Sequence, residues 1–198
     1  MYRPSFHRLV TAGVLALAVL ATAVPASASN DTAGGTLSGR GKAASPAAVV
    51  PAGSVLSVRG AGPYRIGARQ QALAAAGLLD WVAPDPGCDV AHAGATGAWA
   101  GVIILAFRNG RLVEVGTATV PPRSPAGASV GMSWTELEDI YGRRGRLIHN
   151  ADGEQAYLVR AGSGVELYTG HPIRQGVGYY QAGPADFVLR NFRSGTAC

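Results

Sequence analysis

Residues 130–142 have the sequence VGMSWTELEDIYG, and this stretch decides the organisation of the chain. It opens with an apolar residue and a glycine, continues as a short helical run and ends at Gly142. Residues 66–77, IGARQQALAAAG, follow the same plan at an offset of 64 residues, and strand-like sequence comes after both copies. The repeat predicts an α+β fold of two tandem modules, each a short helix packed on an antiparallel β meander.

The second copy carries the clearest local signals. Ser133 and Glu136 have the spacing of a capping box, in which each side chain satisfies a free backbone donor of the first helical turn. Leu137, Ile140 and Tyr141 follow at helical spacing, which predicts an amphipathic helix. Strand candidates separated by turn residues come next, at 146–149, 156–161, 165–169 and 176–181. These elements predict a module over residues 129–183.

The first copy predicts a module over residues 55–120. Its helix spans 70–79, and an apolar run over 98–107 returns through Asn109-Gly110 as a hairpin. Because Ile103, Ile104 and Leu105 are all apolar, this strand is predicted to be covered on both faces.

Two further segments join and follow the modules. Three prolines in residues 121–128 predict a connector between them. Residues 184–198 are predicted to be a C-terminal tail that holds a short helix and is tied down by a disulfide.

The N-terminal segment is typical of a secreted protein. Arg3, His7 and Arg8 precede an apolar run over 9–24, and small residues precede a cut after Ala28, so residues 1–28 are predicted to be a signal peptide. A membrane anchor is the alternative, but the run is shorter than the ~20 residues of a spanning helix. We expect no membrane span in the mature form.

Residues 29–54 are rich in Ala, Gly, Ser and Pro, which predicts a flexible linker. The linker could be a tether that holds the folded part away from the cell surface, and the alternative is a simple N-terminus of the mature protein. The predicted location is extracellular, either free or associated with the cell wall.

The charge of the chain is mildly basic. Removing residues 1–28 takes away two arginines and no acid, which lowers the formal charge from +5 to +3. Nucleic-acid-binding proteins concentrate a stronger basic stripe, so we predict no nucleic-acid partner.

The motif of the second copy resembles a known repeat. The residues Val130-Gly131-Met132-Ser133, Leu137 and Tyr141-Gly142 are similar to the repeat of the β-lactamase inhibitory protein and of small lipoproteins in outer-membrane assembly. The resemblance implies two α/β repeats whose sheets form a concave protein-binding face, and it implies no catalysis. The inhibitor group is expected to carry a disulfide in each repeat, and the lipoproteins a lipidated Cys, neither of which this chain has. The targets of those families therefore do not carry over.

The two cysteines, Cys88 and Cys198, are predicted to form one disulfide, with free thiols or an intermolecular bridge as alternatives. Closing a loop of this length would stabilise the fold by about 4 to 5 kcal/mol in the chain-entropy model. Cys88 and His92 have helical spacing, but no further cluster completes a metal site. We therefore predict neither a metal nor a cofactor.

Partner-binding candidates lie on the predicted strands of the second module. Alternation places Val165 and Leu167 on one face, and Glu166 and Tyr168 on the other. We predict that Tyr157, Tyr168, Tyr180 and Glu166 form a partner-binding face, because exposed aromatic residues are good interface anchors. The alternative is that these tyrosines are half-buried sheet residues.

A basic patch follows the second helix, where Arg143, Arg144 and Arg146 come close together in the sequence. It could dock on an anionic surface such as a cell-wall polymer. The alternative is that these charges complement the C-terminal end of the helix.

A catalytic site is weakly supported. Ser163, His171 and Asp186 could supply a nucleophile, a base and an orienting acid. However, Ser163 lies between two glycines, which is typical of a hairpin turn and not of a nucleophile elbow. We assign no catalytic residue.

The leading hypothesis is a secreted, non-enzymatic protein-binding or inhibitor-like module with a secreted or envelope protein as partner. A cell-envelope accessory protein attached through the basic patch and linker comes second, and a small hydrolase third. The sequence leaves the oligomeric state open.

Overall fold

Eight antiparallel strands form one continuous sheet in the computed structural model, which describes residues 54–195. Their order across the sheet is β4-β5-β6-β7-β11-β10-β9-β8, and β1-β2-β3 form a separate three-stranded sheet. The strands are β1 (Leu56–Ser57), β2 (Gly60–Ala61), β3 (Tyr64–Arg65), β4 (Leu79–Pro84), β5 (Val90–Ala95), β6 (Ile104–Arg108), β7 (Arg111–Thr117), β8 (Gly145–His149), β9 (Gln155–Ala161), β10 (Gly164–Gly170) and β11 (Val177–Pro184). The helices are α1 (Gln70–Ala75), α2 (Trp134–Tyr141) and α3 (Ala185–Ser194), with short 3₁₀ turns at η1 (Gly97–Trp99) and η2 (Gly142–Arg144).

The prediction of two tandem modules is wrong, and so is the resemblance to the β-lactamase inhibitory protein and the outer-membrane-assembly lipoproteins that rested on it. Strand β7 pairs with β11, with Val115 opposite Ala182 and Thr117 opposite Tyr180. This pairing runs through the middle of the sheet, at the position where the two modules were expected to separate. The two halves therefore share one sheet, as the elements on either side of the connector pair directly.

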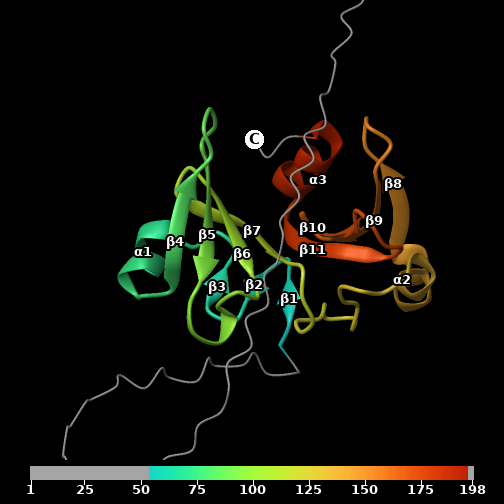
Figure 1. Ribbon diagram of the computed structural model, residues 1–198, viewed down its shortest axis with the longest axis horizontal. Helices are drawn as coiled ribbons and strands as arrows, with labels where there is room; N and C mark the ends of the chain where they lie inside the picture. The colour runs from blue at the N-terminus through green and yellow to red at the C-terminus, as the bar shows by residue number, and fades with distance from the viewer. Residues whose placement is uncertain (1–53, 196–198) are drawn as a thin grey trace, which may run out of the picture. The chain divides into compact units, whose positions relative to one another are not determined.

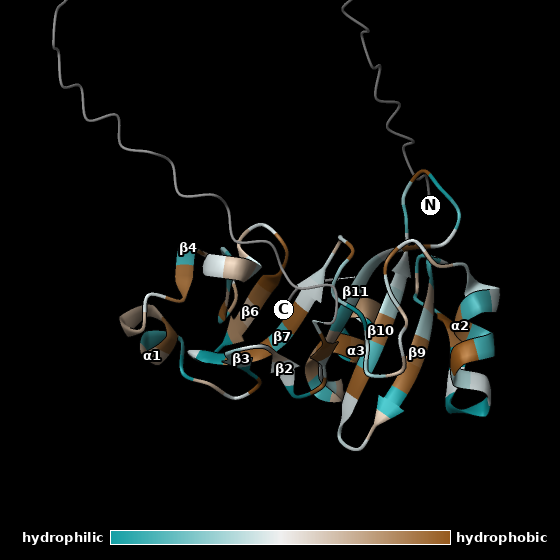
Figure 2. Ribbon diagram, turned by 90° about the horizontal axis from the view of Figure 1, so that it is seen from below, coloured by the Kyte–Doolittle hydropathy of each residue, from teal (hydrophilic) through white to brown (hydrophobic). Residues whose placement is uncertain are grey.

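The two faces of the large sheet carry separate hydrophobic cores. One core packs α1, α2 and the small sheet against the first face and includes Leu56, Leu73 and Leu137. The other packs α3 on the opposite face through Phe187 and Val188. Figure 1 shows α1 beside β4 at one end of the sheet and α2 beside β8 at the other. Brown hydrophobic bands along β9 and β10 in Figure 2 mark strands that contribute to both cores.

Several local predictions are confirmed. The Ser133 hydroxyl accepts a hydrogen bond from the Glu136 backbone N–H, and the Glu136 carboxylate accepts one from the Ser133 backbone N–H. Asn109 and Gly110 both have positive φ, 52° and 67°, as a two-residue hairpin turn requires. The predicted C-terminal helix is α3.

The predicted signal peptide and nearly all of the predicted linker lie outside residues 54–195. Residues 54–195 belong to one compact unit. Within 54–195, every helix is too short or too polar to cross a membrane.

Candidate functional site

The four predicted partner-binding residues are buried. Tyr168 and Tyr180 have no exposed surface, while Tyr157 is 1% and Glu166 5% exposed. Val165 and Leu167 pack in one core and Tyr168 in the other, so the predicted alternation is confirmed. These side chains lie beneath α2 and the small sheet. The alternative interpretation, that the tyrosines are packed sheet residues, fits this burial.

One of the buried tyrosines, Tyr168, belongs to a hydrogen-bonded cluster centred on Tyr141 of α2. We call this cluster the tyrosine network: Ser124, Tyr141, Glu166 and Tyr168. The Tyr141 hydroxyl lies 2.6 Å from a Glu166 carboxylate oxygen, and 2.7 Å from both the Ser124 and the Tyr168 hydroxyl oxygens. Tyr180 stacks on Tyr168, with ring centroids 4.5 Å apart. A buried polar cluster in which every member has a partner specifies one arrangement of the core.

Burial changes the acidity of this network. It raises the pKa of Glu166, and the hydrogen bonds from Tyr141 and Tyr168 and the charge of Arg144 offset part of that effect. Burial also raises the pKa of Tyr141 and of Tyr168, and the nearby Glu166 carboxyl adds to it. The tyrosines therefore stay protonated and act as hydrogen-bond donors.

An arginine-lined hollow lies next to Glu166. It has a volume of about 510 Å³ and is lined by Arg59, Arg144 and Arg160, from the β1–β2 turn, η2 and β9. All three arginines are exposed, and among residues 54–195 Glu166 is the only acid in the lining. Its remaining lining includes apolar side chains such as Val58 and Ile140. The hollow thus combines a positive rim with a hydrogen-bonded carboxyl.

The predicted basic patch adjoins this hollow. Arg143 and Arg146 line a second, smaller hollow of about 80 Å³ together with Arg144 and Arg160. We call the combined set, Arg59, Arg143, Arg144, Arg146 and Arg160, the arginine surface. The Arg144 guanidinium also donates to the Ile140 and Tyr141 carbonyl oxygens, as expected from the alternative interpretation of the patch. Arg144 therefore contributes both to the surface and to the end of α2.

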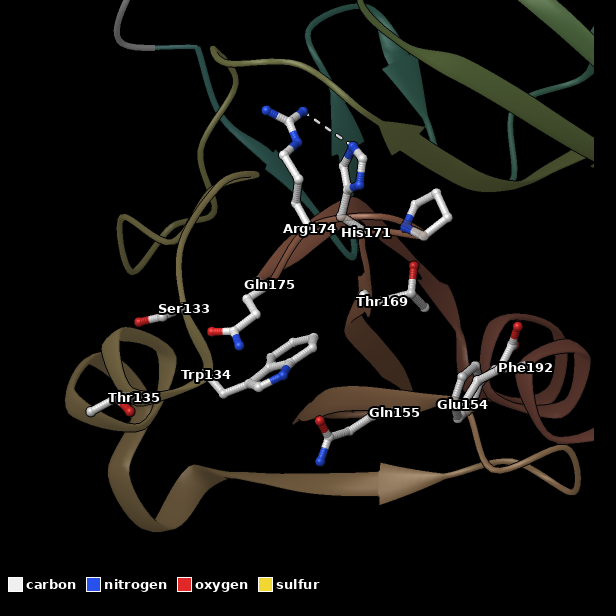
Figure 3. Close-up of a pocket in the computed structure, with 13 residues that line it drawn as sticks. Ser133, Trp134, Thr135, Glu154, Gln155, Thr169, His171, Arg174, Gln175 and Phe192 are labelled. Carbon is white, nitrogen blue, oxygen red and sulfur yellow. Dashed lines mark hydrogen bonds between the residues drawn. The ribbon is translucent and has the colours of Figure 1, made fainter.

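Another hollow lies where β9 begins and β10 ends. We call it the Trp134 pocket; it has a volume of about 780 Å³. Figure 3 shows Trp134 of α2, Gln155 of β9 and Thr169 of β10 around one space, with Phe192 of α3 on the far side. In the β10–β11 loop the Arg174 guanidinium lies 3.1 Å from His171 Nε2.

A third surface feature is an apolar strip on the face of the sheet that α3 also contacts, formed by Trp81, Ile104 and Tyr179. A Cβ added at Gly94 would lie 2.4 Å from Trp81 Nε1, so the indole rests directly on the backbone of β5. Tyr179 rests on Gly116 of β7 in the same way. Trp81 and Ile104 are each 43% exposed. The prediction that the strand holding Ile104 is covered on both faces is wrong at this position.

The three residues considered for catalysis are kept apart by the fold. Ser163 and His171 flank opposite ends of β10, a seven-residue strand that spans roughly 20 Å. Asp186 is paired with Arg108 at 2.7 Å. Since a nucleophile and its base must be within hydrogen-bond reach, these residues do not form a triad.

The cysteines and the metal-ligand candidates form no additional site among residues 54–195. Cys198 lies outside the described residues, so its disulfide with Cys88 stays a prediction. Cys88 packs against the core beneath α3. Among residues 54–195, no three side chains of the types that bind metals come together.

Sequence reasoning missed Arg59 and Arg160 because they are distant from the basic patch along the chain. It also missed Trp81, whose strand β4 falls in a segment that carries no strand-like alternation. The glycines beneath Trp81 and Tyr179 are the one local signal in the sequence for the apolar strip, since a glycine in a strand often marks close approach of another group.

Comparison with known proteins leaves the family open. No family model matches the sequence, and no curated protein matches it. Among solved structures, the chain is similar to a cysteine-rich secretory protein from Staphylococcus aureus, with 13% sequence identity and a TM-score of 0.40. The match covers 67% of this chain and 48% of the staphylococcal chain, so this chain spans about half the length of that protein.

Proposed function

We propose that this protein is a secreted, non-enzymatic binding protein that attaches to an anionic polymer of the bacterial cell envelope through the arginine surface. One observation carries the proposal: Arg59, Arg144 and Arg160, from three separate elements, line one hollow. Arg143 and Arg146 line the hollow beside it. The predicted signal peptide and linker are consistent with this location.

The chemistry of the surface favours phosphate or carboxylate groups. A guanidinium stays charged at all physiological pH values and binds either group through two parallel hydrogen bonds. Glu166 is buried, and its carboxylate already accepts a hydrogen bond from the Tyr141 hydroxyl at 2.6 Å. The surface therefore offers several exposed positive groups against one buried acid that has a hydrogen-bond partner.

Salt should weaken the attachment. All five arginines are exposed to solvent, and the interaction of exposed charges is screened over about 8 Å at physiological ionic strength. Binding that rests on this surface is expected to fall steeply as the salt concentration rises.

The test is co-sedimentation with purified bacterial cell walls whose phosphate-bearing polymers are either intact or chemically removed. The test variant is Arg59→Gln/Arg160→Gln, because neither side chain hydrogen-bonds within residues 54–195. Its matched control is Arg65→Gln/Arg69→Gln, which removes the same charge from another exposed region.

We expect wild type and control to sediment with intact walls at about 50 mM salt and to be released at about 500 mM. The test variant should bind several-fold more weakly, and walls without the polymers should capture none of the proteins. Equal binding of the two variants would rule out the arginine surface as the attachment site.

The apolar strip supports a second candidate, the binding of a protein partner. Exposed aromatic residues held flat on a rigid sheet bury large areas at little entropic cost, which suits an interface. Ile104→Ser tests this candidate, with Ile173→Ser as control because Ile173 is 86% exposed in the β10–β11 loop and is not one of the strip residues. A partner captured from the producer's secreted proteins by wild type and I173S, but not by I104S, would support it. Equal capture by both variants would argue against the strip.

A further inference from the structure

The Trp134 pocket lies apart from the arginine surface, and its lining has a different character. Two aromatic side chains border it. Trp134 is the first residue of α2, and a Cβ added at Gly170 would lie 3.7 Å from its Cζ2 atom, an ordinary van der Waals contact, so the indole lies against the end of β10. Phe192 of α3 borders the pocket from the other side (Figure 3). Both rings are partly exposed and offer flat apolar surfaces to a ligand.

Three neutral polar side chains in the pocket are uncommitted. Gln155, Thr169 and Gln175 line it, and their side chains make no hydrogen bond within residues 54–195. A glutamine amide and a threonine hydroxyl can each both donate and accept. A ligand rich in hydroxyl groups needs partners of this kind, because each hydroxyl also donates and accepts.

The charges of the pocket balance. Arg174 and Glu154 are the cation and the anion in its lining. The Arg174 guanidinium lies against His171, and the Glu154 carboxylate accepts a hydrogen bond from the Asn150 amide at 2.9 Å. Neither sign of charge dominates, so the pocket gives a charged ligand no general advantage.

We propose that the Trp134 pocket binds an uncharged oligosaccharide. The ring of Trp134 stacks on the apolar face of one sugar unit, while Gln155, Thr169 and Gln175 hydrogen-bond its hydroxyl groups. The volume of about 780 Å³ falls within the range of small-molecule sites, roughly 300 to 1,000 Å³. This site is independent of the arginine surface and would add recognition of neutral glycan to attachment through charge.

The experiment is calorimetric titration of the protein with three uncharged trisaccharides, namely triacetylchitotriose, cellotriose and maltotriose, and with anionic trigalacturonate. The variants are Trp134→Ala and Gln175→Ala, and Trp81→Ala is the matched control because Trp81 is also partly exposed. Gln175 lies in an exposed loop, so its variant keeps the test informative if Trp134→Ala proves unstable.

We expect at least one uncharged trisaccharide to bind saturably and trigalacturonate to bind more weakly. Trp134→Ala should lower the affinity at least about tenfold, which corresponds to ~1.4 kcal/mol, and Gln175→Ala about threefold. Trp81→Ala and Arg59→Gln/Arg160→Gln should bind like wild type, which separates this site from the arginine surface.

Any of three results would overturn the proposal. The first is that none of the uncharged trisaccharides binds at concentrations up to roughly 10 mM. The others are tighter binding of trigalacturonate than of the uncharged trisaccharides, and equal affinities of the folded Trp134, Gln175 and Trp81 variants.

Discussion

Replacing Glu114 of β7 with Gln should remove a pH dependence from the stability of this protein. Burial raises the pKa of Glu114 from 4.5 to about 7. Between these values the folded protein keeps a proton on this carboxyl, while the unfolded chain has already lost it. The raised pKa therefore contributes stability that is fully present below pH 4.5, declines as pH rises and is lost by about pH 7.

The size of the effect follows from the shift. One pKa unit corresponds to 1.36 kcal/mol, so a rise from 4.5 to about 7 corresponds to roughly 3 kcal/mol in all. About 2.5 kcal/mol of this falls between pH 5 and pH 8. The Gln181 amide, oriented to satisfy both groups, donates to both Glu114 carboxylate oxygens at 3.0 Å. Because these bonds stabilise the charged form, we expect the free energy of unfolding to fall by about 2 kcal/mol between pH 5 and pH 8.

Urea unfolding at several pH values between 5 and 8 measures this loss. Wild type and Glu114→Gln should have similar free energies of unfolding at pH 5, and the variant should be the more stable by about 2 kcal/mol at pH 8. In an otherwise wild-type protein, Gln181→Met should increase the loss of unfolding free energy between pH 5 and pH 8, because it removes the donors to the charged Glu114 carboxylate. If wild type and Glu114→Gln give parallel curves within about 0.5 kcal/mol, the reasoning from burial is refuted.

Other substitutions test the packing directly. Tyr168→Phe removes one hydroxyl from the tyrosine network and should lower the free energy of unfolding by about 1–2 kcal/mol in urea; an unchanged midpoint would contradict the hydrogen bonds described. Gly94→Ala should push Trp81 off the sheet, shifting its fluorescence to longer wavelength and costing about 1 kcal/mol, and an unshifted spectrum would count against the contact. Ser133→Ala removes the cap of α2 and should cost about 0.5–2 kcal/mol by thermal unfolding, whereas Ser133→Thr should retain most of it.

The features that could be predicted from the sequence are those set by neighbouring residues. The cap of α2 depends on Ser133 and Glu136 and the β6–β7 hairpin on Asn109-Gly110, so each signal lies within a few positions. The pairing of β7 with β11 joins Val115 to Ala182, and no local pattern records it. The complete candidate sites could not be predicted for the same reason, since each is assembled from elements that meet only after the sheet has formed.

The arginine surface also depends on contacts between segments that are distant in the sequence. Arg143, Arg144 and Arg146 were recognised as a patch because they are close in sequence. Arg59 and Arg160 join them only through the fold. The tyrosines of the predicted partner-binding face are buried, and the sequence did not show this for a different reason. Alternation along a strand gives two faces but does not say what covers each one.

The central position of β7 has a consequence for how this chain is made. Its partner β11 comes more than sixty residues later, and synthesis delivers the N-terminal part first. Until β11 arrives, β4 to β7 form a half-sheet whose last strand has an open hydrogen-bonding edge, the kind of edge on which chains aggregate. A truncated chain that ends before residue 177 lacks β11, so the edge of its β7 would stay unpaired. We expect such truncated chains to be removed or to precipitate, because they lack β11, the strand that covers the open edge of β7.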